Sequence, residues 1–189
     1  MSIGLKTLVL NADMMPVNAL TMRANQVEQA IVRVLNGTCF TVATYDRVFS
    51  TAGGKHHIPV PSVMARTKYF KRPETVPYNK QYILLRDNYK CVYCSCPLSI
   101  DTLTYDHYIP KAKGGRDGWN NYLASCGPCN HNYGDTDAKN KKPRHKPYTP
   151  SYSKLVSLRR KYPITLDHES WVDFIQPWKG EITIKDVSL

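Results

Sequence analysis

The sequence lacks long hydrophobic runs. None of its stretches approaches the roughly 18 consecutive apolar residues that a membrane-spanning helix needs. The apolar start at residues 3–10 is interrupted by Lys6 and followed by Asn11 and Asp13, which argues against a signal peptide or a membrane anchor. We therefore expect a protein that is neither secreted nor bound to a membrane.

Acidic residues are also scarce. The 189 residues include 15 Asp and Glu against 26 Lys and Arg, so the formal net charge is +11. An apolar content of 42% is too high for a wholly disordered basic tail, and the length suits one domain or a small catalytic module with appendages. A polyanion is therefore the first partner to expect.

The six cysteines are spaced as metal ligands rather than as a disulfide framework. Four of them form two Cys-x-x-Cys pairs, Cys91 with Cys94 and Cys126 with Cys129. Each pair lets a tight turn aim two sulfurs at one point, and two such turns complete the tetrahedral thiolate shell of a structural Zn²⁺ ion. A zinc site of this kind implies a reducing compartment. The alternatives to a zinc site are a redox-active dithiol and a chance spacing of the cysteines. We leave Cys39 and Cys96 out of the site, with Cys96 as the alternative ligand.

The first part of the chain, residues 1–72, is predicted to form a small α/β unit. Residues 7–10 suit a strand, and residues 38–44 are rich enough in β-branched and aromatic side chains to form another. Between them, Asn25 is a candidate N-cap for a helix whose apolar residues recur at helical spacing. These apolar residues are Val27, Ile31, Val34 and Leu35. After a proline-rich connection, Asn79 suits the N-cap of a further helix.

Residues 73–140 are predicted to form a zinc-clamped module. Alternation over residues 103–109 predicts a strand, the Lys- and Gly-rich residues 111–116 a loop, and residues 122–125 a returning strand. Asn130 is expected to open a helix. One Zn²⁺ ion would clamp both ends of this ββα arrangement, which is too small to have a hydrophobic core of its own.

Residues 141–189 are predicted to form a basic linker and a C-terminal extension of short helices. Repeated prolines favour an extended linker up to Pro150, and residues 155–158 suit a short helix. An aromatic stripe follows at helical spacing, which we expect to pack against the rest of the protein, with base stacking as the alternative. The stripe consists of Trp171, Phe174, Ile175 and Trp178. Together the three parts predict an α+β fold.

Three features occur in the order of a known family. These are the Asp106-His107 dyad, Asn121 within Trp119-Asn-Asn-Tyr-Leu123, and Asn130 directly after the second cysteine pair. The pattern resembles the HNH (ββα-metal) endonucleases, specifically their zinc-knuckle bacterial and phage branch, and the likeness extends over residues 7–137. It implies a metal-dependent enzyme that hydrolyses DNA phosphodiester bonds in the cytoplasm of a bacterial or phage-infected cell. The sequence gives no indication of the oligomeric state.

The resemblance also implies a role for each of these residues. His107 is expected to be the general base, and Asn121 to fix the loop and orient the imidazole. Asp106 and Asn130 are expected to hold a catalytic Mg²⁺ or Mn²⁺ ion. Neighbouring strand residues face opposite ways, and a histidine pKa of about 6.5 leaves the imidazole mostly neutral near neutral pH, so both roles are physically reasonable. The alternatives are Asn120 as the orienting residue, a helix cap as the role of Asn130, and His131 as a metal ligand.

Basic residues flank the cysteine region on both sides. Residues 138–161 carry nine basic residues and no acidic one, residues 66–90 carry seven and two, and residues 91–137 between them carry three and five. This distribution suits an enzyme that holds a phosphate backbone on both sides of its site. Tyr133 stands where the family often has a lysine, so we expect nearby basic residues to contact phosphates. The expected contacts are Lys111, Lys113, Lys139, Lys141, Lys142 and Arg144.

The alternative function is a non-catalytic, zinc-containing nucleic-acid-binding module that uses the same basic arms. The Asp106-His107 dyad separates the two hypotheses, because binding alone has no use for a carboxylate and an imidazole in that setting. The endonuclease is therefore the primary hypothesis.

Overall fold

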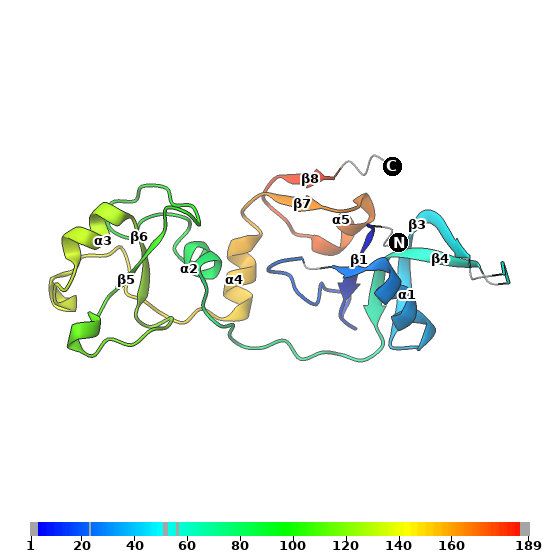
Figure 1. Ribbon diagram of the computed structural model, residues 1–189, viewed down its shortest axis with the longest axis horizontal. Coiled ribbons are helices and arrows are strands. Elements are labelled where there is room, and N and C mark those ends of the chain that lie inside the picture. Colours follow the sequence, from blue (N-terminus) through cyan, green and yellow to red (C-terminus); the bar gives the residue numbers. More distant parts are fainter. Residues whose placement is uncertain (1–3, 23, 51–52, 56, 186–189) are drawn as a thin grey trace. The chain divides into compact units, whose positions relative to one another are not determined.

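The computed structural model describes residues 4–22, 24–50, 53–55 and 57–185 (Figure 1). Helices and strands alternate along the chain, so the fold is of the mixed α+β class. The chain divides into two units, which we call unit 1, Met1–Arg72 with Arg160–Leu189, and unit 2, Pro73–Arg159. Within the described part of the chain, no helix combines the length and the apolar character that crossing a membrane requires.

Unit 1 is built on a four-stranded sheet with the order β2–β1–β4–β3. Its strands are β1 (Lys6–Leu10), β2 (Asn25–Gln26), β3 (Cys39–Ser50) and β4 (His57–Arg66). β1 pairs in parallel with β4 and antiparallel with β2, and β3 pairs antiparallel with β4. A smaller parallel sheet joins β7 (Ile164–Leu166) to β8 (Ile182–Ile184). Between these two strands lie the 3-10 turn η3 (Glu169–Trp171) and helix α5 (Val172–Ile175).

Helix α1 (Val27–Leu35) follows β2, as the helical spacing of its apolar residues predicts. The expected N-cap is wrong, since the capping position is Gln26, which makes no side-chain hydrogen bond there. Asn25 instead lies in β2, where it pairs with Thr7 of β1. The sheet thus takes up Asn25 before the helix begins.

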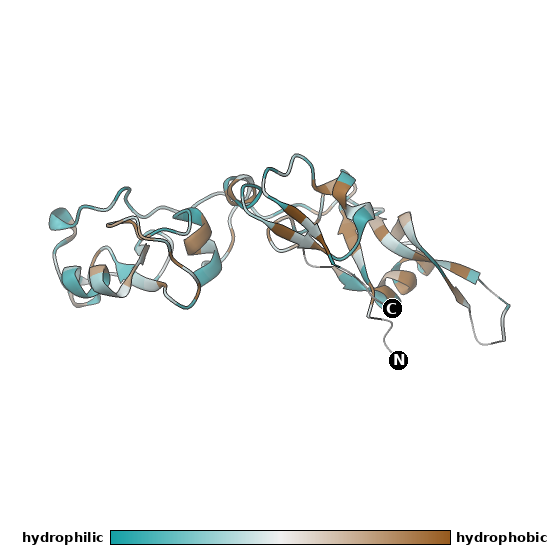
Figure 2. Cartoon of the chain, turned by 90° about the horizontal axis from the view of Figure 1, so that it is seen from above, coloured by the Kyte–Doolittle hydropathy of each residue, from teal (hydrophilic) through white to brown (hydrophobic). Residues whose placement is uncertain are grey.

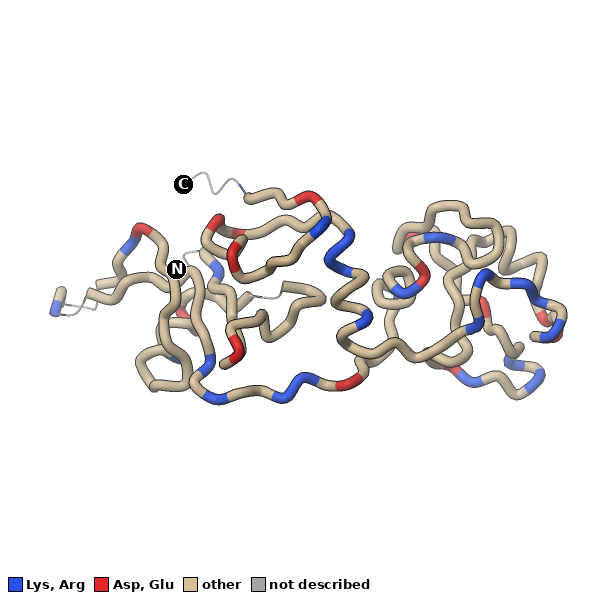
Figure 3. The backbone as a smooth tube through the Cα atoms, turned by 180° about the vertical axis from the view of Figure 1, so that it is seen from behind, with Lys and Arg blue, Asp and Glu red and all other residues tan. Residues whose placement is uncertain are grey.

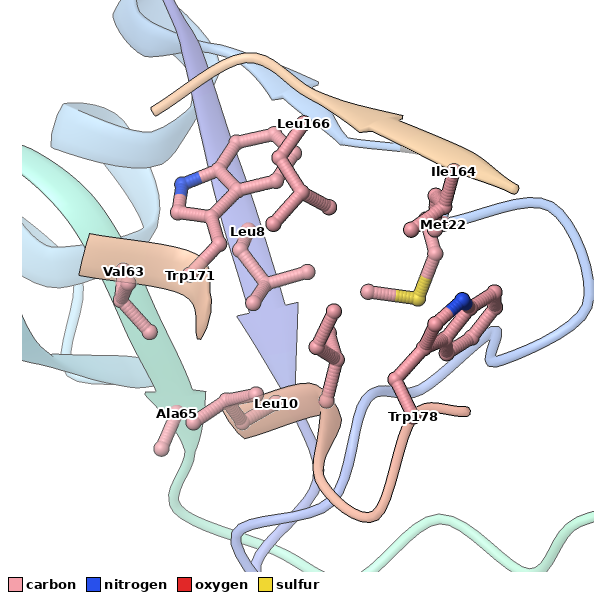
Figure 4. Packing of buried hydrophobic residues seen from close by; sticks show 10 residues of the cluster. Leu8, Leu10, Met22, Val63, Ala65, Ile164, Leu166, Trp171 and Trp178 are labelled. Atoms are coloured by element: carbon pink, nitrogen blue, oxygen red, sulfur yellow. The ribbon is translucent and has the colours of Figure 1, made fainter. Parts of the chain in front are cut away.

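The main core of unit 1 joins residues from both ends of the chain (Figure 4). Alternate residues of β1 and β4 face the two buried tryptophans and the apolar residues of β7 and α5. The Nε1–H of Trp171 donates to the carbonyl of Ser62 at 2.8 Å, which satisfies the polar edge of this buried ring. The expected packing of the aromatic stripe is confirmed, although Trp178 lies beyond α5 rather than on it. The cluster consists of Leu8, Leu10, Met22, Val63, Ala65, Ile164, Leu166, Trp171, Ile175 and Trp178.

Unit 2 is a hairpin in contact with helices. Strands β5 (Thr104–His107) and β6 (Tyr122–Ser125) pair antiparallel. The helices are α2 (Lys80–Arg86), α3 (Gly127–Tyr133) and α4 (Tyr152–Arg159), and the 3-10 turns are η1 (Lys111–Lys113) and η2 (Ala138–Asn140). The Asn79 side chain accepts a hydrogen bond from the backbone N–H of Tyr82 at 2.8 Å, so the expected cap of α2 is confirmed. Because α3 starts at Gly127, Asn130 lies inside the helix rather than at its first residue.

The sequence predicted three parts, with boundaries after residues 72 and 140, whereas the structure divides the last part, residues 141–189, between the two units. Residues 141–159 belong to unit 2, where α4 packs against α2. The described residues after 159 belong to unit 1, because Trp171 and strand β7 contribute to its core. The sequence did not predict β7 and β8, since three-residue strands are too short to show a clear alternation of apolar and polar side chains.

Candidate active site

The hairpin of unit 2 turns the two residues of the Asp106-His107 dyad toward different surroundings. Asp106 lies opposite Leu123 and is 1% exposed, so its carboxylate is buried in the unit. His107 lies opposite Tyr122, and its side chain is 23% exposed. Successive strand residues face opposite ways, which explains the difference. The dyad therefore offers a buried carboxylate beside an accessible imidazole.

Both oxygens of the Asp106 carboxylate have a partner inside unit 2. Oδ1 accepts a hydrogen bond from the ammonium group of Lys141 at 2.7 Å, and Oδ2 accepts one from the hydroxyl of Tyr93. Lys141 also donates to the backbone carbonyl of His107 at 2.6 Å. Burial and the hydrogen bond to Asp106 raise the pKa of Tyr93, so its hydroxyl stays protonated and acts as the donor.

The sequence predicts that Lys141 contacts a phosphate of the nucleic acid, but in the structure its side chain is buried. Its side chain is fully buried at the point where the chain leaves η2. A buried carboxylate without a partner is costly, and an ammonium group at 2.7 Å offsets much of that cost. Lys141 cannot contact a phosphate while its ammonium group stays on Asp106.

The imidazole of His107 is fixed through one of its two nitrogens. Nε2 lies 2.9 Å from Oδ1 of Asp117, and the ring meets Tyr122 edge-on with 4.8 Å between the centroids. Hydrogen bonds from His107, Tyr122 and Lys111 lower the pKa of Asp117 to about 2, so this carboxylate is ionised and accepts the hydrogen of Nε2. The second ring nitrogen, Nδ1, has no hydrogen-bond partner among the described residues.

Asn121 closes the loop between the two strands. Its Oδ1 accepts from the backbone N–H of Ile109 at 2.7 Å, and its Nδ2 donates to the carbonyl of the same residue at 3.0 Å. Gly115 packs against this pair, since a Cβ atom there would lie 1.8 Å from the Ile109 carbonyl oxygen. The side chain of Asn121 holds the loop, whereas Asp117 and Tyr122 are the groups that contact the imidazole.

The other candidates from the sequence lie outside these contacts. The Oδ1 of Asn120 accepts from the hydroxyl of Thr149 at 3.0 Å, and His131 is exposed on α3. Sequence reasoning missed Asp117, because ten residues separate it from His107 and only the closed loop brings the two side chains together. An acidic residue in a Gly-rich loop carries no local signal for such a contact.

Asn130 lies on α3 next to β5. Its Nδ2 donates to the backbone carbonyl of Tyr105 at 3.3 Å, which leaves Oδ1 as the unused end of the carboxamide. Its place inside α3 argues against the helix-cap alternative. Carboxylate and carboxamide oxygens are ligands that hard divalent cations prefer. The donor types of Asp106 and Asn130 therefore fit Mg²⁺ or Mn²⁺, on the condition that Lys141 releases Oδ1 of Asp106.

Five of the six cysteines gather in unit 2. The Sγ atoms of Cys91, Cys94, Cys96 and Cys126 all lie within 4.8 Å of one another. Cys129 lies beside this group, since hydrogen bonds with Cys126 and Cys94 contribute to its pKa. The Sγ atoms of Cys94 and Cys126 are 3.7 Å apart. Two thiolates on one tetrahedral zinc ion are separated by about 3.8 Å, so the cluster could hold zinc.

The closest group of sulfurs differs from the expected zinc ligands in one position. The sequence predicts Cys129 as a ligand and leaves out Cys96, whereas the structure puts Cys96 among the four closest sulfurs. A tight turn explains the difference, because Ser95 has a positive φ of 64° and the N–H of Cys91 donates to the carbonyl of Cys96 at 2.9 Å. This turn folds Cys96 back toward the first cysteine pair.

The thiols of this cluster favour a bound cation. Burial raises the pKa of Cys91, but backbone hydrogen bonds, first of all with Cys94 and Cys126, outweigh burial and lower the pKa to about 6. The hydrogen bond with Cys94 raises the pKa of Cys96 to about 12. Because crowded thiolates oppose one another's ionisation, a metal ion is what would allow four of them to be charged together.

The remaining predicted phosphate contacts differ in how free their side chains are. Lys139 and Lys142 are exposed, and neither forms a salt bridge with a described residue. Arg144 is also exposed, but its guanidinium group donates to the backbone carbonyl of Cys91 at 3.2 Å and so braces the first cysteine pair. Lys139 and Lys142 are therefore the freest cations of this set.

Lys111 and Lys113 are exposed but already paired. The ammonium group of Lys111 lies 3.1 Å from Asp117, and that of Lys113 lies 2.6 Å from Asp137. Exposed ion pairs are weak, so a phosphate can compete for both lysines. Lys111 also places a positive charge beside the carboxylate that holds His107.

A second buried ion pair supports the hairpin. Arg86 donates to both carboxylate oxygens of Asp87, at 2.6 and 2.9 Å. Its other hydrogen bonds go to the backbone carbonyls of Trp119, Tyr122 and Tyr148. Asp87 also accepts from the N–H of Ala124 at 2.8 Å and pairs with His145 at 3.3 Å. Burial raises the pKa of Asp87, but hydrogen bonds from His145 and Arg86 outweigh burial and lower it.

A cavity of about 560 Å³ lies along the loop that Asn121 closes. Residues 114–121 line it together with Tyr78, Ile109 and Thr149. Asp117 borders this cavity and also holds the imidazole of His107. A ligand in the cavity would therefore lie next to the group that orients the dyad.

Comparison with known proteins finds a family for part of unit 2. Residues 91–142 match the sequence model of the HNH endonucleases, which confirms the resemblance over that range. The "Septu protein PtuB" of Bacillus thuringiensis is 38% identical over 67 residues, which are 33% of this chain and 26% of that protein. The chain thus matches about a quarter of that relative's length. No solved structure matches the chain.

Proposed function

Because residues 91–142 match the HNH endonuclease family, we propose that the chain is an endonuclease that hydrolyses DNA phosphodiester bonds at the Asp106-His107 dyad. The observation that carries the proposal is the set of contacts of His107. Its Nε2 lies 2.9 Å from the ionised Asp117, its Nδ1 has no hydrogen-bond partner among the described residues, and its side chain is 23% exposed. That is the arrangement which a general base requires.

In the proposed reaction, Nδ1 of His107 takes a proton from a water molecule as the water oxygen attacks phosphorus. The new P–O bond forms while the bond from phosphorus to the leaving 3′ oxygen breaks, and that oxygen takes up a proton from solvent. Asp117 keeps Nε2 protonated and stabilises the imidazolium that results, as an oriented carboxylate does for any histidine base. The expected products carry 5′-phosphate and 3′-hydroxyl ends, as the family resemblance implies.

Asp106 and Oδ1 of Asn130 are the groups proposed to hold a Mg²⁺ or Mn²⁺ ion. When bound, a divalent ion would polarise the phosphoryl group and stabilise the leaving oxygen. Lys141 has to release Asp106 first, since two cations on one buried carboxylate oxygen repel each other. The proposal therefore includes a movement of Lys141 away from Asp106.

Zinc at the cysteine cluster has a structural role in this proposal. Cys126 directly precedes α3, and Cys91 lies at the start of the segment that carries Tyr93. A metal ion between them would tie the helix of Asn130 to the residue that binds Asp106. Lys139 and Lys142, the freest of the predicted cations, are proposed to contact phosphates of the DNA backbone.

One observation favours the alternative of a non-catalytic, zinc-containing nucleic-acid-binding module. The carboxylate of Asp106 is occupied by Lys141 and Tyr93, as it would be in a module that binds no catalytic ion. The Nδ1 of His107 favours the enzyme, because this nitrogen makes no hydrogen bond to a described residue and so does not help to hold the hairpin.

Incubation of the purified protein with supercoiled plasmid tests the proposed function. We expect nicked or linear DNA in the presence of Mg²⁺ or Mn²⁺, no cleavage with zinc alone or with EDTA, and 5′-phosphate ends on a denaturing gel. A plasmid that is retained by the protein but stays supercoiled with every divalent ion would favour the binding module instead.

A further inference from the structure

The end of β4 in unit 1 leads into a segment of unusual composition, Arg66–Arg72, which we call the aromatic-basic segment. Its sequence is Arg-Thr-Lys-Tyr-Phe-Lys-Arg, with four cationic residues, two aromatic residues and no acidic one. Figure 3 shows Lys and Arg recurring along this stretch after β4. Cations interleaved with aromatic rings are typical of surfaces that bind nucleic acid.

The backbone of this segment is anchored to unit 1. Asn11 is completely buried and binds both polar backbone groups of Phe70, with its Nδ2 donating to the carbonyl at 2.9 Å and its Oδ1 accepting from the N–H at 2.7 Å. Two residues further on, Arg72 forms a bidentate ion pair with Asp13 at 2.7 and 3.0 Å. The segment is therefore held in one conformation rather than left to move.

Although its backbone is anchored, the aromatic rings of the segment remain in solvent. The exposed fractions are 60% for Tyr69 and 43% for Phe70. The guanidinium group of Arg66 lies 5.6 Å from the centroid of the Phe70 ring, within the range of a cation–π contact. Two large rings on a rigid backbone that leaves them uncovered form a preorganised platform for stacking.

A cavity of about 390 Å³ with a mixed polar and apolar lining adjoins the segment through Arg66. Arg33 of α1 is its second cation, and within the described residues neither arginine forms a salt bridge with a carboxylate. Four carboxamides, which can bond the edges of bases, complete its polar lining, and no carboxylate lines it. The carboxamide residues are Asn18, Asn25, Gln26 and Gln29.

We propose that the aromatic-basic segment and this cavity form a second nucleic-acid-binding surface, which takes a strand with unpaired bases. Tyr69 and Phe70 would stack on bases, while Lys68, Lys71 and Arg66 contact phosphates. An acidic peptide would satisfy the cations but not the flat rings, and paired bases in a duplex offer no free face to stack on. The inference extends the proposed function, and it rests on that function for the choice of nucleic acid as the polymer.

Fluorescence anisotropy with the full-length protein tests this surface, without added Mg²⁺ or Mn²⁺. The probes are a labelled single-stranded 20-mer and the duplex of the same sequence. The variant Tyr69→Leu with Phe70→Leu removes stacking and keeps apolar bulk. The matched control is Phe40→Leu with Phe49→Leu, two exposed rings on β3 of the same unit.

We expect the Tyr69 and Phe70 variant to weaken single-strand binding by roughly 10- to 100-fold, since each stacked base contributes about 1–3 kcal/mol. The affinity of the Phe40 and Phe49 control for the single strand should change by less than about threefold. The affinity of the Tyr69 and Phe70 variant for the duplex should also change by less than about threefold. Equal affinities of the variant and the wild type for the single strand would overturn the inference, as would a loss confined to the duplex.

The charge arm uses Lys68→Gln with Lys71→Gln, compared with Arg47→Gln and Lys55→Gln elsewhere in unit 1. Loss of two phosphate contacts should reduce the slope of log Kd against log salt by about 1.4 for a single strand, and the control should leave it unchanged. The measurement of salt dependence still tests the proposed surface if the Tyr69 and Phe70 variant fails to fold.

The two proposals fail separately. Wild-type protein that binds the single strand through these residues but leaves plasmid intact would contradict the endonuclease and keep this surface. Cleaving protein whose single-strand affinity is insensitive to both variants would keep the endonuclease and remove the surface.

Discussion

The two units of this chain are stabilised by different kinds of interaction. In unit 1 an apolar cluster surrounds Trp171, and the buried polar side chains among the described residues of this unit are the uncharged Thr7, Asn11 and Ser62. In unit 2 the described buried residues include four charged ones, Arg86, Asp87, Asp106 and Lys141. Figure 2 shows hydrophobic residues recurring along the strands of unit 1. The charges are buried in the unit that holds the candidate active site.

This difference explains how a small hairpin can hold the Asp106-His107 dyad in a fixed position. Apolar packing tolerates small shifts, whereas a buried carboxylate with two fixed partners has one favourable position. Asp106 and Asp87 each lie in such a network, on β5 and directly after α2. The cysteine cluster adds a third constraint. Unit 2 therefore depends on buried ion pairs, to which a zinc ion at the cysteine cluster would add metal bonds, whereas unit 1 depends on the burial of apolar side chains.

The largest expected effect separates the units by their dependence on zinc. Cys91→Ser should remove the metal and unfold unit 2, while unit 1 keeps its core. Hydrogen exchange would then become fast over residues 104–125 and stay slow over the buried residues of β4 and around Trp171. Loss of protection in both units, or in neither, would contradict the prediction that only unit 2 depends on zinc.

Zinc content also decides which sulfurs bind the metal. Cys96→Ser and Cys129→Ser differ only in which of the two candidate fourth ligands is removed. We expect one variant to keep one zinc ion per chain and the other to lose affinity. The variant that loses zinc identifies the ligand, as measured by metal analysis after dialysis.

The next effect tests a buried charge directly. Asp87→Asn leaves Arg86 buried without its counter-charge, and unit 2 should lose about 3–5 kcal/mol of unfolding free energy. The matched control in unit 1 is Ser62→Ala, a buried uncharged group whose hydroxyl bonds Ser170 and which should cost about 1 kcal/mol. Denaturant unfolding measures both, and similar losses would remove the distinction between the units.

A smaller effect sharpens the role of Lys141. Removal of its ammonium group should free Oδ1 of Asp106, so Lys141→Met should bind Mn²⁺ roughly tenfold more tightly, a change of about 1.4 kcal/mol. Lys142→Met removes the same charge one residue away at the surface and serves as the control. Calorimetric titration of zinc-loaded protein gives the affinities. Unchanged or weaker binding in the Lys141 variant would show that Lys141 does not compete for this carboxylate.

The smallest effect is a pH dependence. The hydrogen bond to Asp87 raises the pKa of His145 above its usual 6.5. The stabilisation that His145 provides is therefore fully present below pH 6.5 and is lost as the pH rises through the raised value. His145 is partly exposed, so the effect should stay below about 1 kcal/mol. The Tm difference between wild type and His145→Asn should shrink from pH 6 to pH 8.5, and a constant difference would exclude the pair.

Local signals predicted much of the fold. The spacing of apolar residues indicated α1 and the hairpin, and Asn79 marked the start of α2. The contribution of the C-terminal segment to unit 1 could not be predicted, because Trp171 meets its partners across more than one hundred residues of sequence. The turn at Ser95 that brings Cys96 to the cluster likewise has no compositional signal.

The candidate site was predictable at the level of motifs and not at the level of contacts. The order of Asp106, His107, Asn121 and Asn130 pointed to this site because it resembles the pattern of the family whose sequence model matches residues 91–142. The partners Asp117 and Lys141 were not, since each reaches the dyad only through a loop or a turn closed by the tertiary structure. A lysine among many basic residues gives no sign that it is the buried one.

Whether His107 is the general base is decided by the rate of plasmid cleavage by His107→Ala, with zinc content and Tm measured on the same preparation. The account predicts at least a 100-fold loss of the cleavage rate, since a general base contributes roughly 10²–10⁴-fold, with zinc content, Tm and DNA retention unchanged. Cleavage within twofold of the wild-type rate would contradict it.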